Sequence, residues 1–594
     1  MSKKEELSYE DYSELRKQGQ AEGTVPEWMQ TAGLQMFMKN YLYEAGNPRQ
    51  QFERIAKTLS EYAPVMVSPA DKVSVMLDKA FTEKQDFKDY WYEKFFNVMW
   101  KAHFCCSTPL MANTGTDRGM PVSCSGGIPV GDSISEFYDA AKEVALLTKE
   151  GFGTAVDVSD VRPRGTLFKG GGKAAGALPV MQMMNDVTSY VSQGSNRRGA
   201  VASYIDIEHK DFYEVAEYLE HHPDELNVGW KVYDKFISKL DNKVASAHKK
   251  FKRSLFVKSV TGKGYYSFPD KAERLKPEAY IKNNLAVASP QLCNEVFLHS
   301  DKDHTYTCVL GWMNLSKYRE WKDTDAVYVA TVLLDCVVSY FLDKAKSIQG
   351  LEKAVRMTEK GRAVGLGAGG LSTLFQQEML PFESVDAYML DKEIFAHIDD
   401  ESLNASKDLA KALGEPEWCK GLGIRMTHRM AVAPTKSTAL IYGGISEGIN
   451  LDPAFSFTQS TAAGEVARVM PVLLNLIKSK GLDVEKCIAD VDKAKGSVQN
   501  VVWLTAKEKE VFKTGFEVKQ EAVIRMASSR QQRIDQGQSL NLFFDSRHDE
   551  GYISSIHQLA FKDKYIKGLY YIVGKRESGE ESQAVEPESC ESCQ

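Results

Sequence analysis

The sequence lacks the features that mark secreted, membrane-spanning and nucleic-acid-binding proteins. Its N-terminus, MSKKEELSYEDYSELRKQ, has no apolar core of the kind that a signal peptide requires. The most apolar run, 326–342, falls short of the about 20 residues of a membrane span and contains Asp335, which favours a buried helix. A net charge of −7 and a pI near 6.0 give no basic footprint for nucleic acid. We therefore expect a cytoplasmic protein that contacts neither membrane nor nucleic acid.

Cysteine is also sparse, since ten in 594 residues cannot form a disulfide scaffold. Five of the ten nevertheless fall into two arrangements. Cys590 and Cys593 form a CESC pair in an acidic tail, whereas Cys124, Cys293 and Cys308 lie in segments with folded patterns. A dithiol on a flexible arm can reduce a buried disulfide and return to solvent, so the pair predicts a body that uses thiols as reagents. A zinc half-site is the alternative, but no second Cys or His pair is near, and we expect no metal ligand set in this chain.

The chain divides into three regions and has no fixed-period repeat. Residues 1–105 are rich in helical periodicity and aromatic side chains. From 106 to about 460, short apolar runs alternate with helical patterns and glycine-rich turns, which favours an α/β architecture, and 461–574 is mainly helical again. The segment 575–594 has six Glu and no aromatic residue, which predicts a flexible tail. We therefore expect a helical N-terminal region, a large catalytic α/β domain over 106–574 and a redox-active tail.

The segment GLGAGG, 365–370, matches the G-x-G-x-x-G pattern of dinucleotide-binding loops. Only Arg362, Ala363 and Val364 precede it as a strand, and the usual run of branched residues is missing. Close packing against a helix is therefore the favoured interpretation over a nicotinamide site.

The segment PTKSTA, 434–439, lies between the apolar run MAVA and a predicted helix. Hydroxyl and backbone N–H groups at such a junction would suit a phosphate. An ordinary helix N-cap explains the pattern equally well.

In QLCNE, Cys293 and Glu295 are two residues apart, so on a strand both would face the same way. A thiol and a carboxylate on one face suit radical or acid–base chemistry. Tyr570 and Tyr571 could form a redox-active pair, although a chain with 26 tyrosines has adjacent pairs by chance, and 265–266 is another.

Taken in order, the motifs resemble those of the large (α) subunit of class I ribonucleotide reductase over about 105–594. They are STPLMANTG, VSCSG, GDSISE, QGSNRRGA, QLCNE, CVLGWMNLS, RAVGLGAGGL, PTKSTA, RQQRIDQGQSLNLF, GLYYIVGKR and the tail dithiol. The resemblance implies a ten-stranded α/β barrel with a helical N-terminal region and a disordered C-terminal tail. It also implies reduction of ribonucleoside diphosphates to 2′-deoxyribonucleoside diphosphates by thiyl-radical chemistry.

The resemblance implies a role for each reactive side chain. Cys293 is the residue that becomes a thiyl radical and abstracts the 3′ hydrogen, and Glu295 is the general base toward the 3′-hydroxyl. Cys124 and Cys308 supply the reducing equivalents and end as a disulfide. Gln291 stands where the family usually has Asn, which keeps the amide but adds a methylene.

Four more residues are implied to move electrons. Tyr570 and Tyr571 correspond to the stacked pair that passes the radical in from a partner subunit. Cys590 and Cys593 correspond to the shuttle that reduces the internal disulfide.

The resemblance also implies two nucleotide sites. The substrate-binding residues are Thr108, Ser123, Cys124, Gln291, Glu295, Lys436, Ser437 and Thr438. The effector-binding residues are Asp132, Ser133 and Arg197. Lys436 replaces the Glu of many relatives, which adds positive charge beside the substrate phosphates.

The implied partners are a small (β) subunit, a second α chain, thioredoxin or glutaredoxin, and nucleotides. No cofactor is expected to stay bound to this chain, because a metal in the small subunit generates the radical, and a dNTP or ATP acts as allosteric effector. The leader before Thr108 is too short for the ATP-binding cone of many relatives. We therefore expect one effector site per chain and activity that persists at high dATP.

Two alternatives remain open from the sequence. An adenosylcobalamin-dependent reductase shares the barrel and the cysteine trio but would not need Tyr570 and Tyr571. A regulatory paralogue without activity would fit Gln291 but has no use for a tail dithiol.

Overall fold

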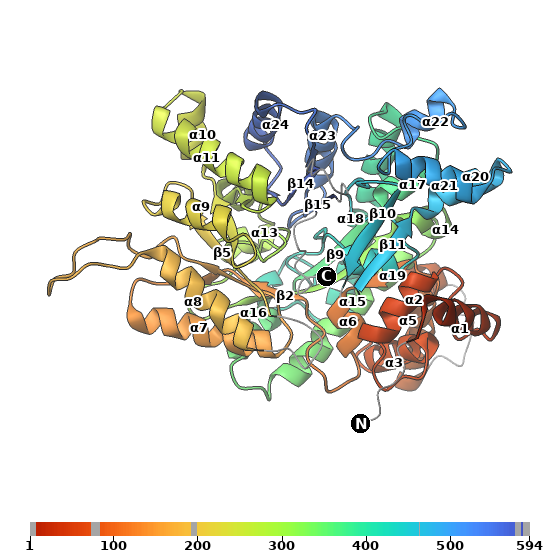
Figure 1. Cartoon of the computed structure of the whole chain (residues 1–594). Helices are drawn as coiled ribbons and strands as arrows, with labels where there is room; N and C mark the ends of the chain where they lie inside the picture. Colours follow the sequence, from red (N-terminus) through yellow and green to blue (C-terminus); the bar gives the residue numbers. More distant parts are fainter. Residues whose placement is uncertain (1–6, 73–82, 192–198, 462–463, 576–583, 586–594) are drawn as a thin grey trace.

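The computed structural model describes residues 7–72, 83–191, 199–461, 464–575 and 584–585. The chain opens with helices that gather on one side of the molecule (Figure 1, red). They are α1 (Tyr9–Ala21), α2 (Thr31–Asn40), α3 (Pro48–Ser60) and α5 (Lys84–Trp100), with the 3-10 turn η1 (Pro69–Asp71). In α3, Asn47 caps the first turn, Pro48 occupies N1, and Phe52, Ile55 and Leu59 fall on one buried face. The predicted helical N-terminal region is confirmed.

The first half of the barrel is a sheet of six strands in the order β13-β7-β6-β5-β4-β3. The strands are β3 (Ile128–Pro129), β4 (Thr154–Asp157), β5 (Val201–Asp206), β6 (Asn227–Lys231), β7 (Tyr265–Ser267) and β13 (Gly568–Leu569). All are parallel except β13, which runs antiparallel to β7. Parallel neighbours need long crossovers, and helices provide them (Figure 1, orange and yellow). These helices are α7 (Ile134–Lys149), α8 (Ala177–Tyr190), α9 (Phe212–His221), α10 (Asp234–Asp241) and α11 (Ala245–Thr261). The short helices α12 (Pro269–Arg274) and α13 (Glu278–Lys282) follow β7.

The second half is built around β8, which is buried along its whole length. β8 (Tyr306–Asn314) pairs antiparallel with β1 (Phe104–Cys106) and β2 (Cys124–Gly126), and parallel with β9 (Val364–Gly369). A parallel bridge between Cys124 and Gly153 joins this sheet to the first. Helical segments accompany these strands: α6 (Thr108–Asn113), η2 (Leu315–Lys317), α14 (Tyr318–Trp321), α15 (Ala326–Ala345), α16 (Glu352–Gly361), α17 (Leu371–Gln377), α18 (Val385–Leu413), η3 (Glu417–Cys419) and α19 (Lys436–Ile441).

Backbone hydrogen bonds continue the ring from β9 round to β13. They run from Tyr570 N to Leu540 O, from Val432 N to Gly537 O and from Leu366 N to Arg429 O. The remaining elements are β10 (Ser456–Thr461), β11 (Gly464–Val469), α20 (Pro471–Ser479), α21 (Val484–Lys493), α22 (Ala506–Val511), α23 (Gln520–Gln531), β12 (Leu542–Phe544), α24 (Glu550–Lys562), β14 (Ile572–Lys575) and β15 (Ala584–Val585). The predicted α/β barrel is confirmed. Of the predicted tail beyond β14, the described part is β15, which pairs antiparallel with β14.

The apolar run of the sequence forms α15, the one helix of the described chain that is long and apolar enough to cross a membrane. Of its apolar window, 89% is buried inside the protein. The helix packs against α5, α16, α18 and β8. Asp335, its buried acid, is paired with Arg362 at 2.8 Å, so the charge is compensated. α15 is thus a core helix, as predicted.

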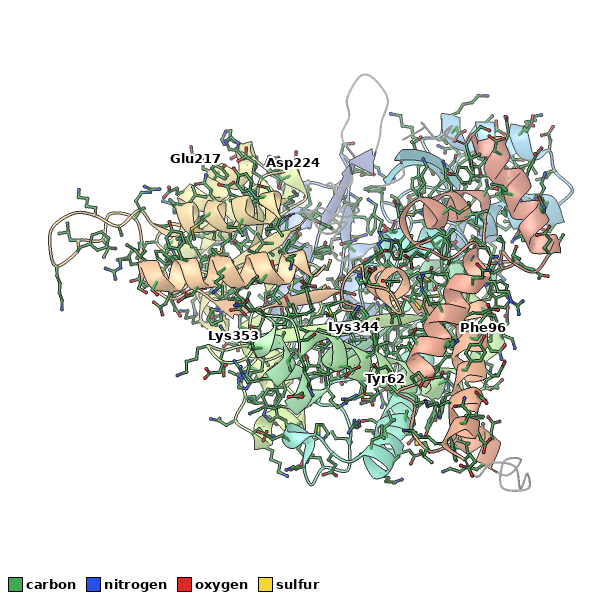
Figure 2. The ribbon with its side chains drawn as sticks, turned by 90° about the horizontal axis from the view of Figure 1, so that it is seen from below. Tyr62, Phe96, Glu217, Asp224, Lys344 and Lys353 are labelled. Atoms are coloured by element: carbon green, nitrogen blue, oxygen red, sulfur yellow. The ribbon has the colours of Figure 1, made fainter. Side chains whose placement is uncertain are left out.

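Polar contacts at the perimeter tie the helices to the barrel. Tyr62, just after α3, donates to Asp343 on α15 at 2.8 Å, and Lys344 donates to the backbone near α6 (Figure 2). Lys353 on α16 pairs with Glu143 on α7 at 2.8 Å. These contacts hold the helical layers in a fixed relation to the strands, whose inner side carries the reactive groups.

Candidate active site

The barrel interior contains a buried cluster that is separate from the main hydrophobic core. Its members include three cysteines and two tyrosines that the sequence singled out: Cys124, Cys293, Cys308, Tyr570 and Tyr571. The three cysteines have no exposed surface, and the tyrosines are 2% and 6% exposed. Residues far apart in the chain therefore meet in one buried cluster. We call the space around Cys124, Cys293, Cys308, Tyr570 and Tyr571 the thiol chamber.

Cys124 on β2 and Cys308 on β8 are direct cross-strand partners. Directly opposed residues of an antiparallel pair have Cα atoms about 4.5–5.5 Å apart, which lies within the range that a disulfide spans. Burial raises the pKa of the Cys308 thiol well above its usual value, and the nearby Glu295 raises it further. The Cys308 thiol therefore stays protonated rather than ionised.

Cys293 lies on a tight turn and not on a strand, so the strand alternation considered for QLCNE does not apply. Asn294, between Cys293 and Glu295, has φ of 63°, a left-handed conformation. Its side-chain amide donates to Tyr266 O at 2.9 Å and to Leu569 O at 3.2 Å, which ties the turn to β7 and β13. The turn, rather than strand alternation, positions the thiol and the carboxylate.

Gln291 holds this turn through its side chain. Its Oε1 accepts the backbone N–H groups of Glu295 at 3.1 Å and Val296 at 2.8 Å. Among the described residues its Nε2 has no hydrogen-bond partner although it is buried. A buried amide donor without a partner costs free energy unless a ligand accepts from it.

Ser539 links the thiol loop to the acid. Its hydroxyl lies 2.7 Å from Cys293 O and 2.9 Å from Glu295 Oε2, and its single proton serves one of these oxygens at a time. Gly537 N donates to Glu295 O at 2.8 Å. The segment 537–539 therefore fixes both the backbone and the carboxylate of Glu295. It lies within the motif RQQRIDQGQSLNLF, to which the sequence assigned no role.

The tyrosine pair reaches the central thiol directly. The Tyr570 hydroxyl lies 3.6 Å from Cys293 Sγ, and the rings of Tyr570 and Tyr571 have centroids 3.9 Å apart. An unbroken contact path therefore runs from Tyr571 through Tyr570 to Cys293.

Two neighbours of the pair were missed by the sequence reasoning. Tyr265, which we read as part of a chance pair, donates its hydroxyl to that of Tyr571 at 3.3 Å and packs 4.9 Å from the Tyr570 ring. Lys258 on α11 is fully buried and donates to the carbonyls of Gly264 and Tyr570. No sequence motif marks either residue, because each is more than 300 positions from the pair it contacts.

Burial of Lys258 predicts a pH dependence of stability. Burial lowers the pKa of Lys258 to about 7, whereas an unfolded lysine has a pKa of about 10.4. Between these values the unfolded chain binds more protons, so the free energy of unfolding should rise with pH by up to about 1.4 kcal/mol per pH unit. Below pH 7 both states are protonated and this dependence vanishes. We expect the free energy of unfolding to rise less from pH 7 to pH 9 in Lys258→Met than in the unsubstituted protein. Denaturant titrations at the two pH values measure this difference.

The matched control is Lys407→Met, because Lys407 lies on the exposed side of α18. It should keep the full pH dependence. An unchanged difference between pH 7 and 9 in Lys258→Met would contradict the depressed pKa.

The predicted substrate residues lie on segments that meet at one side of the chamber. Ser123 is buried and donates to Ser107, and Thr108 begins α6 with its hydroxyl 3.1 Å from that of Tyr41. At the end of α19, Tyr442 accepts from the backbone N–H of Cys106 on β1, which ties the two segments together.

α19 begins at Lys436 and includes Ser437 and Thr438, so the predicted junction before a helix is confirmed. Thr435 at the N-cap makes no side-chain capping bond, since its hydroxyl accepts from Gly448 N instead. An ordinary side-chain N-cap is therefore wrong for this segment.

The predicted effector residues fall at the start of α7. Ser133 caps that helix by accepting from Glu136 N at 3.3 Å, and Asp132 binds the backbone and guanidinium of Arg162. Arg197 lies outside the described residues, as do Cys590 and Cys593.

GLGAGG does not form a nucleotide loop. It lies on β9, where a Cβ at Gly365 would come 2.5 Å from Leu310 and one at Gly367 2.6 Å from Ala431 O. The glycines serve close packing, as predicted, but between neighbouring strands rather than against a helix.

Sequence comparison decides the family. The model described as "Ribonucleotide reductase, barrel domain" matches residues 122–248, 216–421 and 417–572, and that of the "all-alpha domain" matches 28–119. The chain belongs to the ribonucleotide reductase family. A Frog virus 3 (isolate Goorha) protein, provisionally named a ribonucleoside-diphosphate reductase large subunit, is 32% identical over 502 residues, covering 81% of this chain and 87% of the relative.

Two further members of the family support the match. The ribonucleoside-diphosphate reductase large subunit of Invertebrate iridescent virus 3 is 25% identical over 82% of this chain and 88% of its own. The solved Actinobacillus ureae class Id ribonucleotide reductase alpha subunit superposes with a TM-score of 0.80 at 32% identity, covering 92% of this chain and 97% of that one. The family predicted from the order of motifs is therefore confirmed.

Proposed function

We propose that this chain is the catalytic large subunit of a class I ribonucleotide reductase that reduces ribonucleoside diphosphates to 2′-deoxyribonucleoside diphosphates. The observation that carries the proposal is the chamber in which Tyr570 contacts Cys293 while Cys124 and Cys308 face each other across β2 and β8. A binding module would need neither a buried radical path nor a buried dithiol.

The reaction balances with the groups present. A Cys293 thiyl takes the 3′ hydrogen of the ribose, and Glu295 accepts the 3′-hydroxyl proton, which eases departure of the 2′ oxygen as water. Cys124 and Cys308 lose two electrons and two protons in forming a disulfide, and a C2′–H bond replaces the C2′–O bond. Cys293 then returns its hydrogen to C3′. Burial excludes water and so protects the radical between these steps.

The same chamber supplies binding groups for the substrate. The buried Nε2 of Gln291 is a donor that a ribose hydroxyl would satisfy, which gives the Gln in place of Asn a direct role. Ser123 directly precedes Cys124 and donates to Ser107, the neighbour of Thr108, while Lys436, Ser437 and Thr438 offer a cation and hydroxyls for the diphosphate at the start of α19. This set makes the substrate an anionic nucleotide.

The proposal requires partners that deliver the radical, the effector and the electrons. A metal-containing small subunit would supply the radical to Tyr571, and thioredoxin or glutaredoxin would restore the tail dithiol. A dNTP or ATP would bind near Asp132 and Ser133. The cytoplasm, where thiols stay reduced, is the compartment that suits this cycle.

A second α chain would cover the faces of α7 and α8. Ile134 and Tyr138 on α7 are 73% and 65% exposed, and Tyr190 at the end of α8 is 88% exposed. Exposed large apolar side chains on adjacent helices indicate an interaction surface. A homodimer through this face would also place the effector residues near its interface.

The decisive experiment is a reduction assay on a ribonucleoside diphosphate, with the chain alone, with a candidate class I small subunit, and with adenosylcobalamin. Product only with the small subunit is the expected result. Product with adenosylcobalamin alone would assign the chain to the cobalamin-dependent reductases, and no product in any arm would favour a regulatory paralogue.

The tail prediction separates chemistry from turnover. A protein with Cys590→Ser and Cys593→Ser should form about one product per prereduced Cys124–Cys308 pair and then stall with thioredoxin, because nothing carries electrons into the chamber. Rapid-quench product counts measure the first round of product formation, and steady-state assays measure continued turnover. A small dithiol that enters the chamber should restore turnover. Normal steady-state turnover with thioredoxin would contradict the shuttle.

A further inference from the structure

Outside the thiol chamber, one group of side chains in the described chain is arranged as metal ligands: His299, Asp301 and His304, on the loop between Glu295 and β8. Each offers one ligand atom, and these atoms all lie within 4.8 Å of one another. The His299 and His304 side chains are 8% and 16% exposed, whereas Asp301 is 42% exposed. An ion could therefore enter past the carboxylate and meet two sheltered imidazoles.

The hydrogen bonds of His299 define which ring nitrogen is available. Its Nδ1 lies 2.8 Å from Ala286 O, and a carbonyl only accepts, so Nδ1 carries the hydrogen. In the neutral ring Nε2 then carries a lone pair and no hydrogen, and this atom lies 3.0 Å from Asp301 Oδ2. Two lone pairs at this distance need a positive centre, either a proton or a metal ion. Metal-binding histidines are commonly oriented in this way, with the ring N–H that does not face the metal donating to a backbone carbonyl.

The carboxylate of Asp301 is held in place by its own loop. Its Oδ1 accepts the backbone N–H groups of Asp303 and His304, both at 2.8 Å, and Asp301 N donates to His304 O at 2.8 Å. His304 Nδ1 lies 3.0 Å from the same Oδ1. The backbone thus fixes the three ligands relative to one another before any ion binds, so little ordering is required.

Surrounding groups shelter the two imidazoles. The Trp418 ring packs 5.9 Å from His299 and 5.5 Å from His304. The backbone N–H of His299 donates to the Tyr280 hydroxyl at 2.9 Å. The site is therefore walled by aromatic rings on one side and open on the side of Asp301.

We propose that His299, Asp301 and His304 bind a divalent transition metal ion, with zinc as the best match and a fourth position left for water. Two imidazoles and a carboxylate are ligands of zinc and its neighbours, whereas Mg²⁺ and Ca²⁺ prefer more oxygen ligands. The ion would fix the loop that joins the Cys293–Glu295 turn to β8, which carries Cys308. Its role is structural, and it does not depend on the reaction proposed above.

The test uses the full chain with Cys590→Ser and Cys593→Ser, because the tail thiols would themselves bind zinc. After chelator treatment, the protein is titrated with Zn²⁺ by calorimetry and with Co²⁺ by visible absorption. One ion per chain, a cobalt spectrum without thiolate charge-transfer bands, and a higher Tm in the presence of Zn²⁺ are expected. His304→Ala removes one of three ligands, and Asp301→Asn replaces a charged carboxylate with a weaker neutral amide oxygen, so each should weaken binding by about 100-fold.

The matched control is His222→Ala. His222 also faces a carboxylate, Glu225, at 3.2 Å, but no third ligand joins them among the described residues, so its substitution should leave the ion bound. The proposal is overturned if the parent binds no Zn²⁺, which would make the trio a hydrogen-bond cluster only. It is equally overturned if His304→Ala and Asp301→Asn both bind Zn²⁺ like the parent, or if the cobalt spectrum shows thiolate ligation.

Discussion

Cys293→Ser should fold and bind nucleotides like the unsubstituted protein and yet form no detectable deoxyribonucleotide. Serine nearly matches cysteine in size, so the turn held by Gln291 and Asn294 can persist. The serine O–H bond is too strong to be broken by the tyrosyl radical that cleaves a thiol S–H bond. We expect a loss of at least about 1000-fold, equivalent to about 4 kcal/mol of transition-state stabilisation. A product assay with the small subunit, paired with a nucleotide-binding measurement, checks both halves of the result.

Cys336→Ser is the matched control for this prediction. Cys336 is equally buried, on α15, but belongs to the main core and not to the chamber. Its substitution should alter stability while the catalytic constant stays near that of the unsubstituted protein. Multiple-turnover activity in purified Cys293→Ser would overturn the assignment of the radical-bearing thiol.

The order of motifs along the chain was sufficient to predict the family and the barrel. Single motifs were not sufficient, because each also has a simple structural explanation. For GLGAGG the structural explanation is correct, since the glycines of β9 let neighbouring backbones approach. The apolar run at α15 was also readable, since its composition demands burial wherever it lies. These features depend on local chemistry, which a sequence carries directly.

Relations across the barrel could not be predicted from the residues alone, and the pairing of Cys124 with Cys308 came from the family resemblance. That Cys124 and Cys308 are register partners depends on how β2 pairs with β8, and nothing in either strand specifies the partner. The strand alternation considered for Cys293 and Glu295 does not apply, because Asn294 adopts a left-handed turn that distant carbonyls on β7 and β13 fix. The residue roles themselves stay predictions, since geometry places groups together without reporting which of them react.

The same distinction applies to the tyrosines. Tyr570 and Tyr571 were recognisable as a pair, whereas Tyr265 was set aside as a chance neighbour of Tyr266. Packing separates these two residues. Tyr265 donates to the Tyr571 hydroxyl, while Tyr266 hydrogen-bonds to Ser254, away from the pair. Adjacent residues on β7 point to opposite faces of the sheet, so only one can reach the chamber.

Tyr570→Phe and Tyr571→Phe should each lower turnover by at least about 1000-fold, or about 4 kcal/mol, while substrate affinity changes little. Phenylalanine keeps the ring contact at 3.9 Å between centroids but has no hydroxyl proton to release on oxidation. In Tyr570→Phe the contact of 3.6 Å to Cys293 Sγ is lost as well, so Cys293 has no tyrosyl radical to which it can pass its hydrogen. Turnover with the small subunit and equilibrium binding of substrate measure the two quantities separately.

Tyr266→Phe and Tyr265→Phe are the matched comparisons, since all four residues are buried tyrosines. Tyr266→Phe should retain activity, because its hydroxyl contacts Ser254 and not the pair. Tyr265→Phe removes the hydroxyl that donates to Tyr571, so we expect a loss of turnover smaller than that of Tyr571→Phe. If Tyr570→Phe and Tyr571→Phe both remain active with the small subunit, the radical enters the chamber by another route. Activity of these variants with adenosylcobalamin would identify that route, because a cofactor bound beside Cys293 needs no tyrosine relay.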